Sequence, residues 1–233
     1  SAQLARVRGD TRTSMLHLAK ALAADPRNAP AWADLGEIYL ELGRPDQTRQ
    51  AMERALTLAP QDARHWHLVG MALHAERRHA DAIAAFERGL AQAGATPRQR
   101  VALAACLLDA GDPLRALAET GHALRDDPAD AQAHFVLGTV HSTSGRHADA
   151  IAAFAAASDC DPTLARAHYN RALALDELGQ TEAAALACAA ALAIDEDLWP
   201  ALAQLVFIER RLCDWGDLAV LAQRLRDAVR DGA

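Results

Sequence analysis

The chain has 233 residues and a formal net charge of −7, and this acidic balance argues against nucleic acid as a partner, which would favour a basic face. Although 51% of the residues are hydrophobic, no apolar run approaches the ~18 to 20 residues of a membrane span. The first residues also lack the charged start and apolar core of a signal peptide. We therefore expect a cytoplasmic protein that contacts no membrane.

Four cysteines are scattered through the chain without a C-x-x-C pair: Cys106, Cys160, Cys188 and Cys213. Their spacing supplies neither a disulfide framework nor a zinc motif. Three of them occupy helix positions at which a small buried side chain is the ordinary reason for a cysteine. We expect reduced thiols.

Residues 1–28 combine a glycine, Gly9, with two threonines that suit the N-cap of a helix, Thr11 and Thr13. An apolar series follows, made of Met15, Leu18, Ala21 and Leu22. We predict a turn at Gly9 and then a helix that covers the exposed end of the next element. Because the chain has no initiator methionine, we interpret it as a fragment that starts inside a helix, in the later part of a preceding repeat.

Residues 29–62 predict a helical hairpin. One apolar series at spacings of three, four and seven marks the first helix: Trp32, Leu35, Gly36 and Tyr39. Gly43 breaks that helix. A second series marks the second helix: Met52, Ala55 and Leu56. Pro60 ends the second helix, because proline has no N–H and cannot continue it.

The hairpin recurs with a period of 34 residues. The octapeptide HADAIAAF occurs at residues 79–86 and again two periods later at 147–154. The turn glycines keep the same register: Gly9, Gly43, Gly111, Gly145 and Gly179. We define five full repeats, at residues 29–62, 63–96, 97–130, 131–164 and 165–198. One hairpin cannot bury its apolar face alone, so neighbouring hairpins must stack.

Position eight of each repeat holds a small residue. The five residues are Gly36, Gly70, Ala104, Gly138 and Ala172. A larger side chain there would push the two helices of a hairpin apart, so we expect their closest approach at this position. In the fifth repeat, Cys188 replaces the usual aromatic residue at position 24.

Residues 199–233 predict a helical pair that closes the array. A helix over 200–212 meets Cys213 where earlier repeats have glycine. Asp214 is suited to cap a second helix, and Trp215 to cover the last apolar surface. That helix should present one apolar face, made of Leu218, Leu221, Leu225 and Val229.

The residues of the first repeat, Trp32, Leu35, Gly36, Tyr39, Ala55 and Pro60, resemble the tetratricopeptide repeat signature. The resemblance covers nearly the whole chain. It implies an all-α, right-handed superhelical solenoid whose job is to bind a protein or a peptide. Weak self-association through the first helix or the convex face is a further expectation.

The resemblance also implies a concave groove lined by the first helix of each repeat, at positions two, five, nine and twelve. The candidate groove residues are Arg64, His67, Met71, His74, Arg98, Val101, Phe135, Arg166, Tyr169 and Asn170. We expect the arginines to bind carboxylates or backbone carbonyls of a partner. We expect the region from Phe135 to Tyr169 to contact an apolar side chain of that partner. The alternative is that the arginines are solvated and that the aromatic residues pack against neighbouring repeats.

Residues 208–229, with Cys213, Asp214 and Trp215, resemble the segment that joins the repeats to the catalytic region in O-linked N-acetylglucosamine transferases and their SPINDLY-like bacterial relatives. This second resemblance implies the substrate-binding arm of a glycosyltransferase without its catalytic domain. Animal members carry a ladder of asparagines at position six, and only Asn170 matches it here. The alternative is a free-standing scaffold or assembly factor.

A zinc site usually needs three or four convergent ligands. The histidines provide only pairs, at residues 65 and 67, 67 and 74, and 134 and 141. We therefore expect surface or groove histidines, with no metal and no cofactor. The sequence has no glycine-rich phosphate loop after a strand and no nucleophile with ordered partners. We do not expect this chain to be an enzyme.

Overall fold

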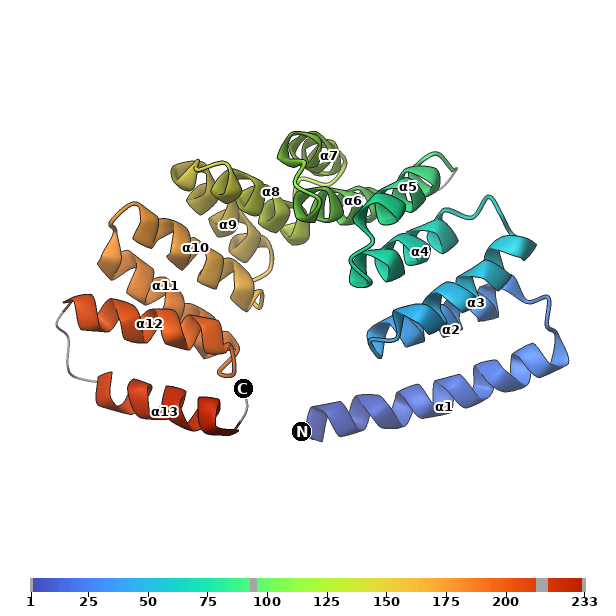
Figure 1. The fold of residues 1–233 in the computed structure, drawn as a ribbon, viewed down its shortest axis with the longest axis horizontal. Helices are drawn as coiled ribbons and strands as arrows, with labels where there is room; N and C mark the ends of the chain where they lie inside the picture. Colours follow the sequence, from blue (N-terminus) through green and yellow to red (C-terminus); the bar gives the residue numbers. More distant parts are fainter. Residues whose placement is uncertain (1, 93–95, 213–217, 232–233) are drawn as a thin grey trace. The chain divides into compact units, whose positions relative to one another are not determined.

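A computed structural model describes residues 2–92, 96–212 and 218–231, and every regular element in these ranges is an α-helix (Figure 1). The helices are α1 (Ala2–Ala24), α2 (Ala29–Glu41), α3 (Pro45–Leu58), α4 (Ala63–Ala75), α5 (His79–Leu90), α6 (Pro97–Asp109), α7 (Pro113–Asp126), α8 (Ala131–Thr143), α9 (His147–Cys160), α10 (Ala165–Glu177), α11 (Thr181–Ile194), α12 (Trp199–Leu212) and α13 (Leu218–Asp231). The expected all-α class is confirmed. None of the described helices has the length and apolar content needed to cross a membrane.

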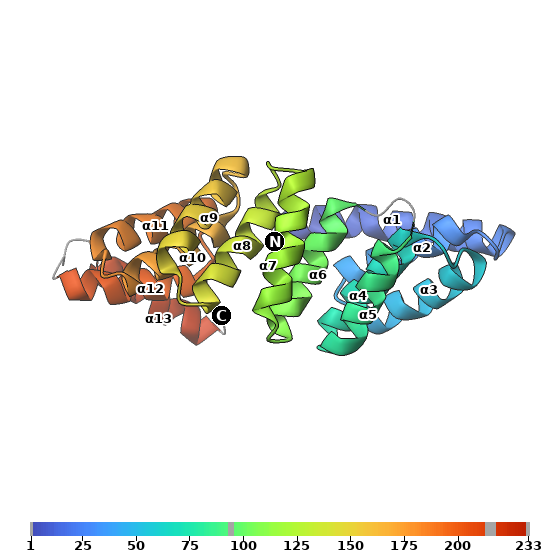
Figure 2. The same ribbon diagram turned by 90° about the horizontal axis from the view of Figure 1, so that it is seen from above.

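The chain divides into two compact units, residues 1–119 and 120–233, with the boundary inside α7. In the first unit, consecutive helices from α1 to α6 pack against one another, and α2 also contacts α4 while α4 contacts α6. In the second unit, consecutive helices from α8 to α13 pack in the same way, and α8 also contacts α10 (Figure 2). Each unit is therefore a stack of hairpins in which first helices meet first helices.

Side chains and prolines at the helix starts explain several of the boundaries. The Asn28 carboxamide oxygen accepts a hydrogen bond from the backbone N–H of Ala31 at 3.0 Å, and the Asp130 carboxylate accepts one from Ala133 at 2.9 Å. These are N-caps, which satisfy N–H groups that have no partner inside the helix. Pro45 and Pro97 begin α3 and α6, where the missing proline N–H costs nothing.

The turns inside the hairpins use a left-handed backbone conformation. Gly43, Gly111, Gly145 and Gly179 have φ angles between 68° and 82°. In the second hairpin the same turn position is occupied by Arg77, whose φ angle is 59°. A Cβ atom is unfavourable in this region, so Arg77 is a point of local strain.

Position eight is where two helices of a hairpin come closest. A Cβ atom added to Gly70 would lie 2.5 Å from the ring of Phe86, and one added to Gly138 would lie 2.6 Å from Phe154. Both phenylalanine side chains are fully buried. The absent side chain at position eight therefore makes the space that the aromatic ring fills.

The packing at position eight depends on the size of the facing residue at position 24. A Cβ atom added to Gly36 would meet only the terminal methyl group of Met52, at 2.4 Å. In the α10–α11 hairpin, Ala172 belongs to the same buried cluster as Cys188. Alanine at position eight thus accompanies a small residue at position 24, whereas glycine accompanies a large one.

Position four of the first, second and fourth repeats is hydrogen-bonded to the end of the repeat before it. The indole N–H of Trp32 donates to the carbonyl of Pro26 at 3.0 Å, and that of Trp66 donates to Pro60 at 3.0 Å. Nε2 of His134 lies 2.9 Å from the equivalent carbonyl oxygen, that of Pro128 at the end of the preceding repeat. The polar residue in the fourth repeat therefore keeps the hydrogen bond that tryptophan makes in the first two.

The prediction of a turn at Gly9 was wrong. Gly9 lies inside α1, which runs without a break from Ala2 to Ala24. Glycine is tolerated within a helix at a cost of about 1 kcal/mol relative to alanine, so a glycine in register with the turns does not by itself require a turn. The apolar part of α1 does pack on α2, because Met15 and Leu18 contact the cluster formed by Leu22, Ala31 and Leu35.

The C-terminal helix is present, but its packed face is rotated from the predicted one. Leu221 packs against the buried cluster of α10, α11 and α12, and Ala228 is buried. Val229 was placed on the apolar face, yet its side chain is 68% exposed. The predicted turn of Cys213, Asp214 and Trp215 lies outside the described residues.

We expect the substitution Gly70→Ala to lower the free energy of unfolding by about 1 to 3 kcal/mol, because its methyl group overlaps the Phe86 ring. In a Phe86→Cys background the same substitution should instead be neutral or stabilising, because the ring is gone and alanine is the better helix former by about 1 kcal/mol. Urea denaturation of the four proteins in this double-mutant cycle measures the coupling. An equal effect in both backgrounds would contradict the packing described here.

We expect Arg77→Gly to raise the free energy of unfolding by about 0.5 to 1 kcal/mol, because glycine adopts the φ angle of this turn without the penalty of a Cβ atom. The matched control is Gly43→Ala, at the same turn position with a φ angle of 68°, which should destabilise the protein. Thermal unfolding followed by circular dichroism reports both. A loss of stability in Arg77→Gly would show that the arginine side chain itself is needed there.

Candidate functional site

The first unit has a concavity of about 890 Å³ on the side where the first helices meet. We call it the α4 concavity. Its principal lining residues are Glu37 and Leu40 of α2, Arg64, His67 and Met71 of α4, and Arg98 of α6. The three α4 residues follow one another at spacings of three and four, which places them on one face of the helix. Four of the ten predicted groove residues therefore come together here.

Arg64 is paired within the protein. Its guanidinium group donates to the Asp34 carboxylate at 2.8 Å and to the Glu37 carboxylate at 2.5 Å. These contacts join α4 to α2 across the repeat boundary. A partner carboxylate would have to compete with two resident ones, so Arg64 acts as part of the wall of the concavity.

Arg98 differs from Arg64. Its side chain is exposed at the edge of the concavity, and it makes no ion pair or hydrogen bond with another described residue. Its positive charge disfavours protonation of His67. Arg98 is therefore the cation of the α4 concavity that is open to a ligand.

His67 is held neutral at physiological pH. Burial, followed by the charge of Arg98, lowers its pKa from 6.5 to about 4, and Glu37 opposes the shift. Its ring contacts the Phe86 ring at a centroid distance of 5.7 Å. Its Nδ1 atom is buried without a hydrogen-bond partner among the described residues. Buried polar atoms are normally paired, and this nitrogen would have to turn toward the concavity before it could bond to a ligand group.

Two further predicted residues of the first unit lie away from the α4 concavity. Val101 is 3% exposed and packs in the core, so it presents no surface to a ligand. His74 lies near the end of α4, and its Nε2 atom is 2.7 Å from the Asp109 carboxylate. Position five was expected to face the groove, but at Val101 this face of α6 is covered by other residues.

The remaining predicted residues lie in the second unit. The Arg166 guanidinium group stacks over the Phe135 ring at 5.7 Å, and Phe135 contacts Phe154 at 5.7 Å. Phe135 therefore packs against Phe154 of its own hairpin and against Arg166 of the next repeat. Tyr169 and Asn170 are partly exposed, and burial followed by the neighbouring Cys188 raises the pKa of Tyr169.

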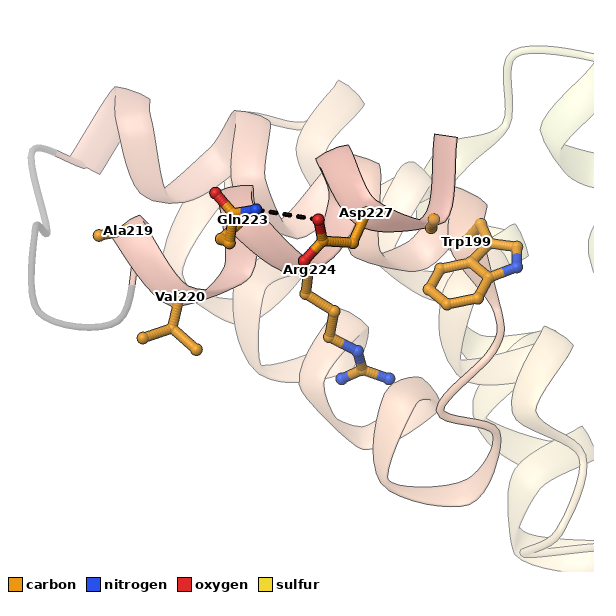
Figure 3. Close-up of a pocket in the computed structure, with 7 residues that line it drawn as sticks. Trp199, Ala219, Val220, Gln223, Arg224 and Asp227 are labelled. Carbon is orange, nitrogen blue, oxygen red and sulfur yellow. Dashed lines mark hydrogen bonds between the residues drawn. The ribbon is translucent and has the colours of Figure 1, made fainter. Parts of the chain in front are cut away.

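Helices α12 and α13 form another open, largely apolar hollow, of about 680 Å³ (Figure 3). Trp199 lines it from α12, and Val220 and Arg224 line it from α13. The Gln223 carboxamide donates to the Asp227 carboxylate at 3.0 Å along its rim. The sequence indicates only a closing role for these helices, and this hollow carries no signal in it.

Glu37 and Leu40 were also absent from the predicted set, although the sequence held the signal. They occupy positions nine and twelve of the first repeat, the positions that the groove rule names. The acidic side of the α4 concavity is formed by Glu37 together with Glu41.

Comparison with known proteins gives a consistent family. Three sequence profiles described as tetratricopeptide repeat match residues 8–72, 101–165 and 165–198. Protein NPG1 of Arabidopsis thaliana is 32% identical over 132 residues, which are 54% of this chain and 19% of that protein. The cytochrome c-type biogenesis protein CycH of Rhizobium meliloti is 34% identical over 113 residues, which are 47% of this chain and 30% of CycH. The chain thus spans less than a third of each.

Solved structures share the architecture. The type IV pilus biogenesis factor PilW matches with a TM-score of 0.77 and 24% identity over 87% of this chain and 94% of PilW. Cut9–Hcn1 of the APC/C matches with a TM-score of 0.82 and 18% identity over 94% of this chain and 43% of its own. YrrB, described as having an unusual peptide-binding site, matches with a TM-score of 0.57 and 22% identity over 80% of this chain and 96% of YrrB. At these identities the likeness shows the fold alone.

The lowered pKa of His67 makes stability depend on pH. Between pH 6.5 and about 4 the unfolded chain binds a proton at this residue and the folded chain does not, so stability is lost as the pH falls. We expect His67 to contribute up to about 3 kcal/mol of this loss. The variant His67→Leu should show a shallower loss of stability than the wild type between pH 6.5 and 4 in urea denaturation. The difference between the two proteins should stop changing above pH 7, and equal slopes throughout would contradict the shift.

Proposed function

Because this chain belongs to the tetratricopeptide repeat proteins, we propose that it is a protein-binding assembly factor that holds an extended segment of another polypeptide against the α4 concavity. The observation that carries the proposal is the open guanidinium group of Arg98 at the edge of a concavity that the ring of His67 also lines. A polypeptide supplies partners for both, through its backbone amides and carbonyls.

The chemistry of the lining favours a particular kind of segment. Met71 and Leu40 offer flexible apolar contacts, and methionine adapts its shape to different side chains. Glu37 is already paired with Arg64, so Glu41 supplies the negative charge on the α2 side, whereas Arg98 adds positive charge on the α6 side. We propose a ligand segment with an apolar side chain between a basic group near α2 and a carbonyl or carboxylate near α6.

Two of the relatives support a role in assembly. CycH and PilW are both described as biogenesis proteins, and YrrB is described as having a peptide-binding site. The cytoplasmic location stays a prediction from the sequence.

The role as the substrate-binding arm of a glycosyltransferase is the second candidate. It rests on Cys213, Asp214 and Trp215, which lie outside the described residues, and on the helix that follows them. None of the relatives reported above is described as a glycosyltransferase. A pair of nucleotide-binding domains encoded after residue 233 would favour this candidate, whereas a stop codon there would remove it.

The experiment uses peptides selected from a random displayed library on the wild-type chain, which are then titrated by calorimetry. We expect Arg98→Ala and His67→Leu each to weaken binding by about tenfold or more, the effect of losing a hydrogen bond worth about 1.5 kcal/mol. The matched control is Arg54→Ala, which removes an exposed arginine from the second helix α3 and should leave affinity unchanged.

Three outcomes would count against the α4 concavity as the binding surface. The first is unchanged affinity in both Arg98→Ala and His67→Leu, and the second is an equal loss in Arg54→Ala. The third is the absence of any selected peptide. Circular dichroism of each variant shows whether the fold is intact before the titrations are compared.

A further inference from the structure

Three metal-binding side chains converge at the junction between the second and third repeats. His74 comes from the end of α4, His79 begins α5, and Cys106 comes from α6. Their ligand atoms all lie within 4.8 Å of one another, and within the described residues this is the one group of three or more such side chains. The histidine rings stand edge to face at a centroid distance of 5.6 Å.

Small movements would bring these atoms to a bonding geometry. Zinc bonds of about 2.0 to 2.3 Å put tetrahedral ligand atoms about 3.3 to 3.8 Å apart, so the ligand atoms must close by about 1 Å. His74 is 22% exposed, which leaves its ring room to rotate and gives an ion a path from solvent. Cys106 is fully buried, and its thiol already points to this junction, since Sγ donates to the backbone carbonyl of His79 at 3.7 Å.

Asp109 adds the partner that histidine ligands usually have. Its carboxylate oxygen lies 2.7 Å from Nε2 of His74, so it accepts a hydrogen bond from that nitrogen when the nitrogen carries the proton. This leaves Nδ1 of His74 as the metal-binding atom, and the carboxylate fixes the tautomer and the ring orientation. The arrangement of carboxylate and histidine is common at zinc sites.

The repeat itself provides an internal comparison. HADAIAAF begins with His79 in the second repeat and with His147 in the fourth. Nδ1 of both histidines is buried without a hydrogen-bond partner among the described residues, so this nitrogen alone does not define a site. Two periods after His74 and Cys106 the sequence has Ser142 and Ala174, neither of which is a ligand for zinc. Only the first copy carries the set.

The ligand types select the metal. Two imidazoles and one thiolate suit a borderline-soft ion such as Zn²⁺, whereas calcium and magnesium prefer oxygen ligands. Burial, followed by the charge of Asp109, raises the pKa of Cys106 to about 11, so the ion has to displace the thiol proton when it binds.

We propose that His74, His79 and Cys106 bind one zinc ion, with Asp109 as the positioning residue of His74. The ion fastens α6 to the turn between α4 and α5. Because α4 and α6 also carry His67 and Arg98, the bound ion holds both sides of the α4 concavity at a fixed spacing.

The test uses the full chain after treatment with a chelator, titrated with Zn²⁺ by calorimetry and with Co²⁺ by absorption spectroscopy. The wild type should bind one ion per chain, raise its melting temperature with zinc, and show a thiolate-to-cobalt charge-transfer band. His74→Ser introduces the residue found at the equivalent position of the fourth repeat, and Cys106→Ala the one found in the fifth. Each substitution should weaken zinc binding by about 100-fold or more. Asp109→Asn should weaken it by about 10 to 100-fold.

The matched control is His147→Ala, which removes the first histidine of the other octapeptide and should keep wild-type affinity. No zinc binding by the wild type, or equal binding by Cys106→Ala and wild type, would overturn the proposal. So would cobalt binding without the charge-transfer band, because the thiolate would then not be a ligand. Since Cys106 is buried, His74→Ser at a partly exposed position serves as the second variant if Cys106→Ala does not fold.

Discussion

The contact between position eight and position 24 is the constraint on which each hairpin depends. At Gly70 and Gly138 no side chain can be added without meeting a buried phenylalanine ring, and the ring fills the space between the two helices. Where the facing residue shrinks to Cys188, position eight can grow to Ala172. A larger residue at position eight thus accompanies a smaller one at position 24, as close packing in a core favours. Stacking of hairpins follows, because each pair buries only one of its apolar faces.

A repeating sequence builds the scaffold, and departures from the repeat supply the chemistry. Arg64 and Arg98 occupy the same position of successive repeats, yet Arg64 is paired with Asp34 and Glu37 while Arg98 stays open. Likewise, His79 and His147 begin identical octapeptides, but only His79 has a histidine and a cysteine beside it. The position in the repeat sets where a side chain lies, and the neighbouring repeat determines what it can do there.

Candidate site residues were predictable only in part, and the reasons are physical. The spacing of Arg64, His67 and Met71 identified one face of α4 correctly, because helical geometry depends on sequence spacing alone. Val101 followed the same rule and is buried, because its exposure depends on helices that are distant in sequence. The group of His74, His79 and Cys106 was missed for the same reason, since its members come from three helices.

By itself, the sequence determined the type of the elements and the period at which they recur. Its period of 34 residues, small residues at position eight and turn glycines predict a row of helical hairpins, because these signals act within one hairpin. Only the tertiary structure decided that α1 runs through Gly9, that Val229 faces solvent, and which charges of the α4 concavity are neutralised. These outcomes depend on contacts between repeats, where burial and pairing are settled by side chains that lie far apart along the chain.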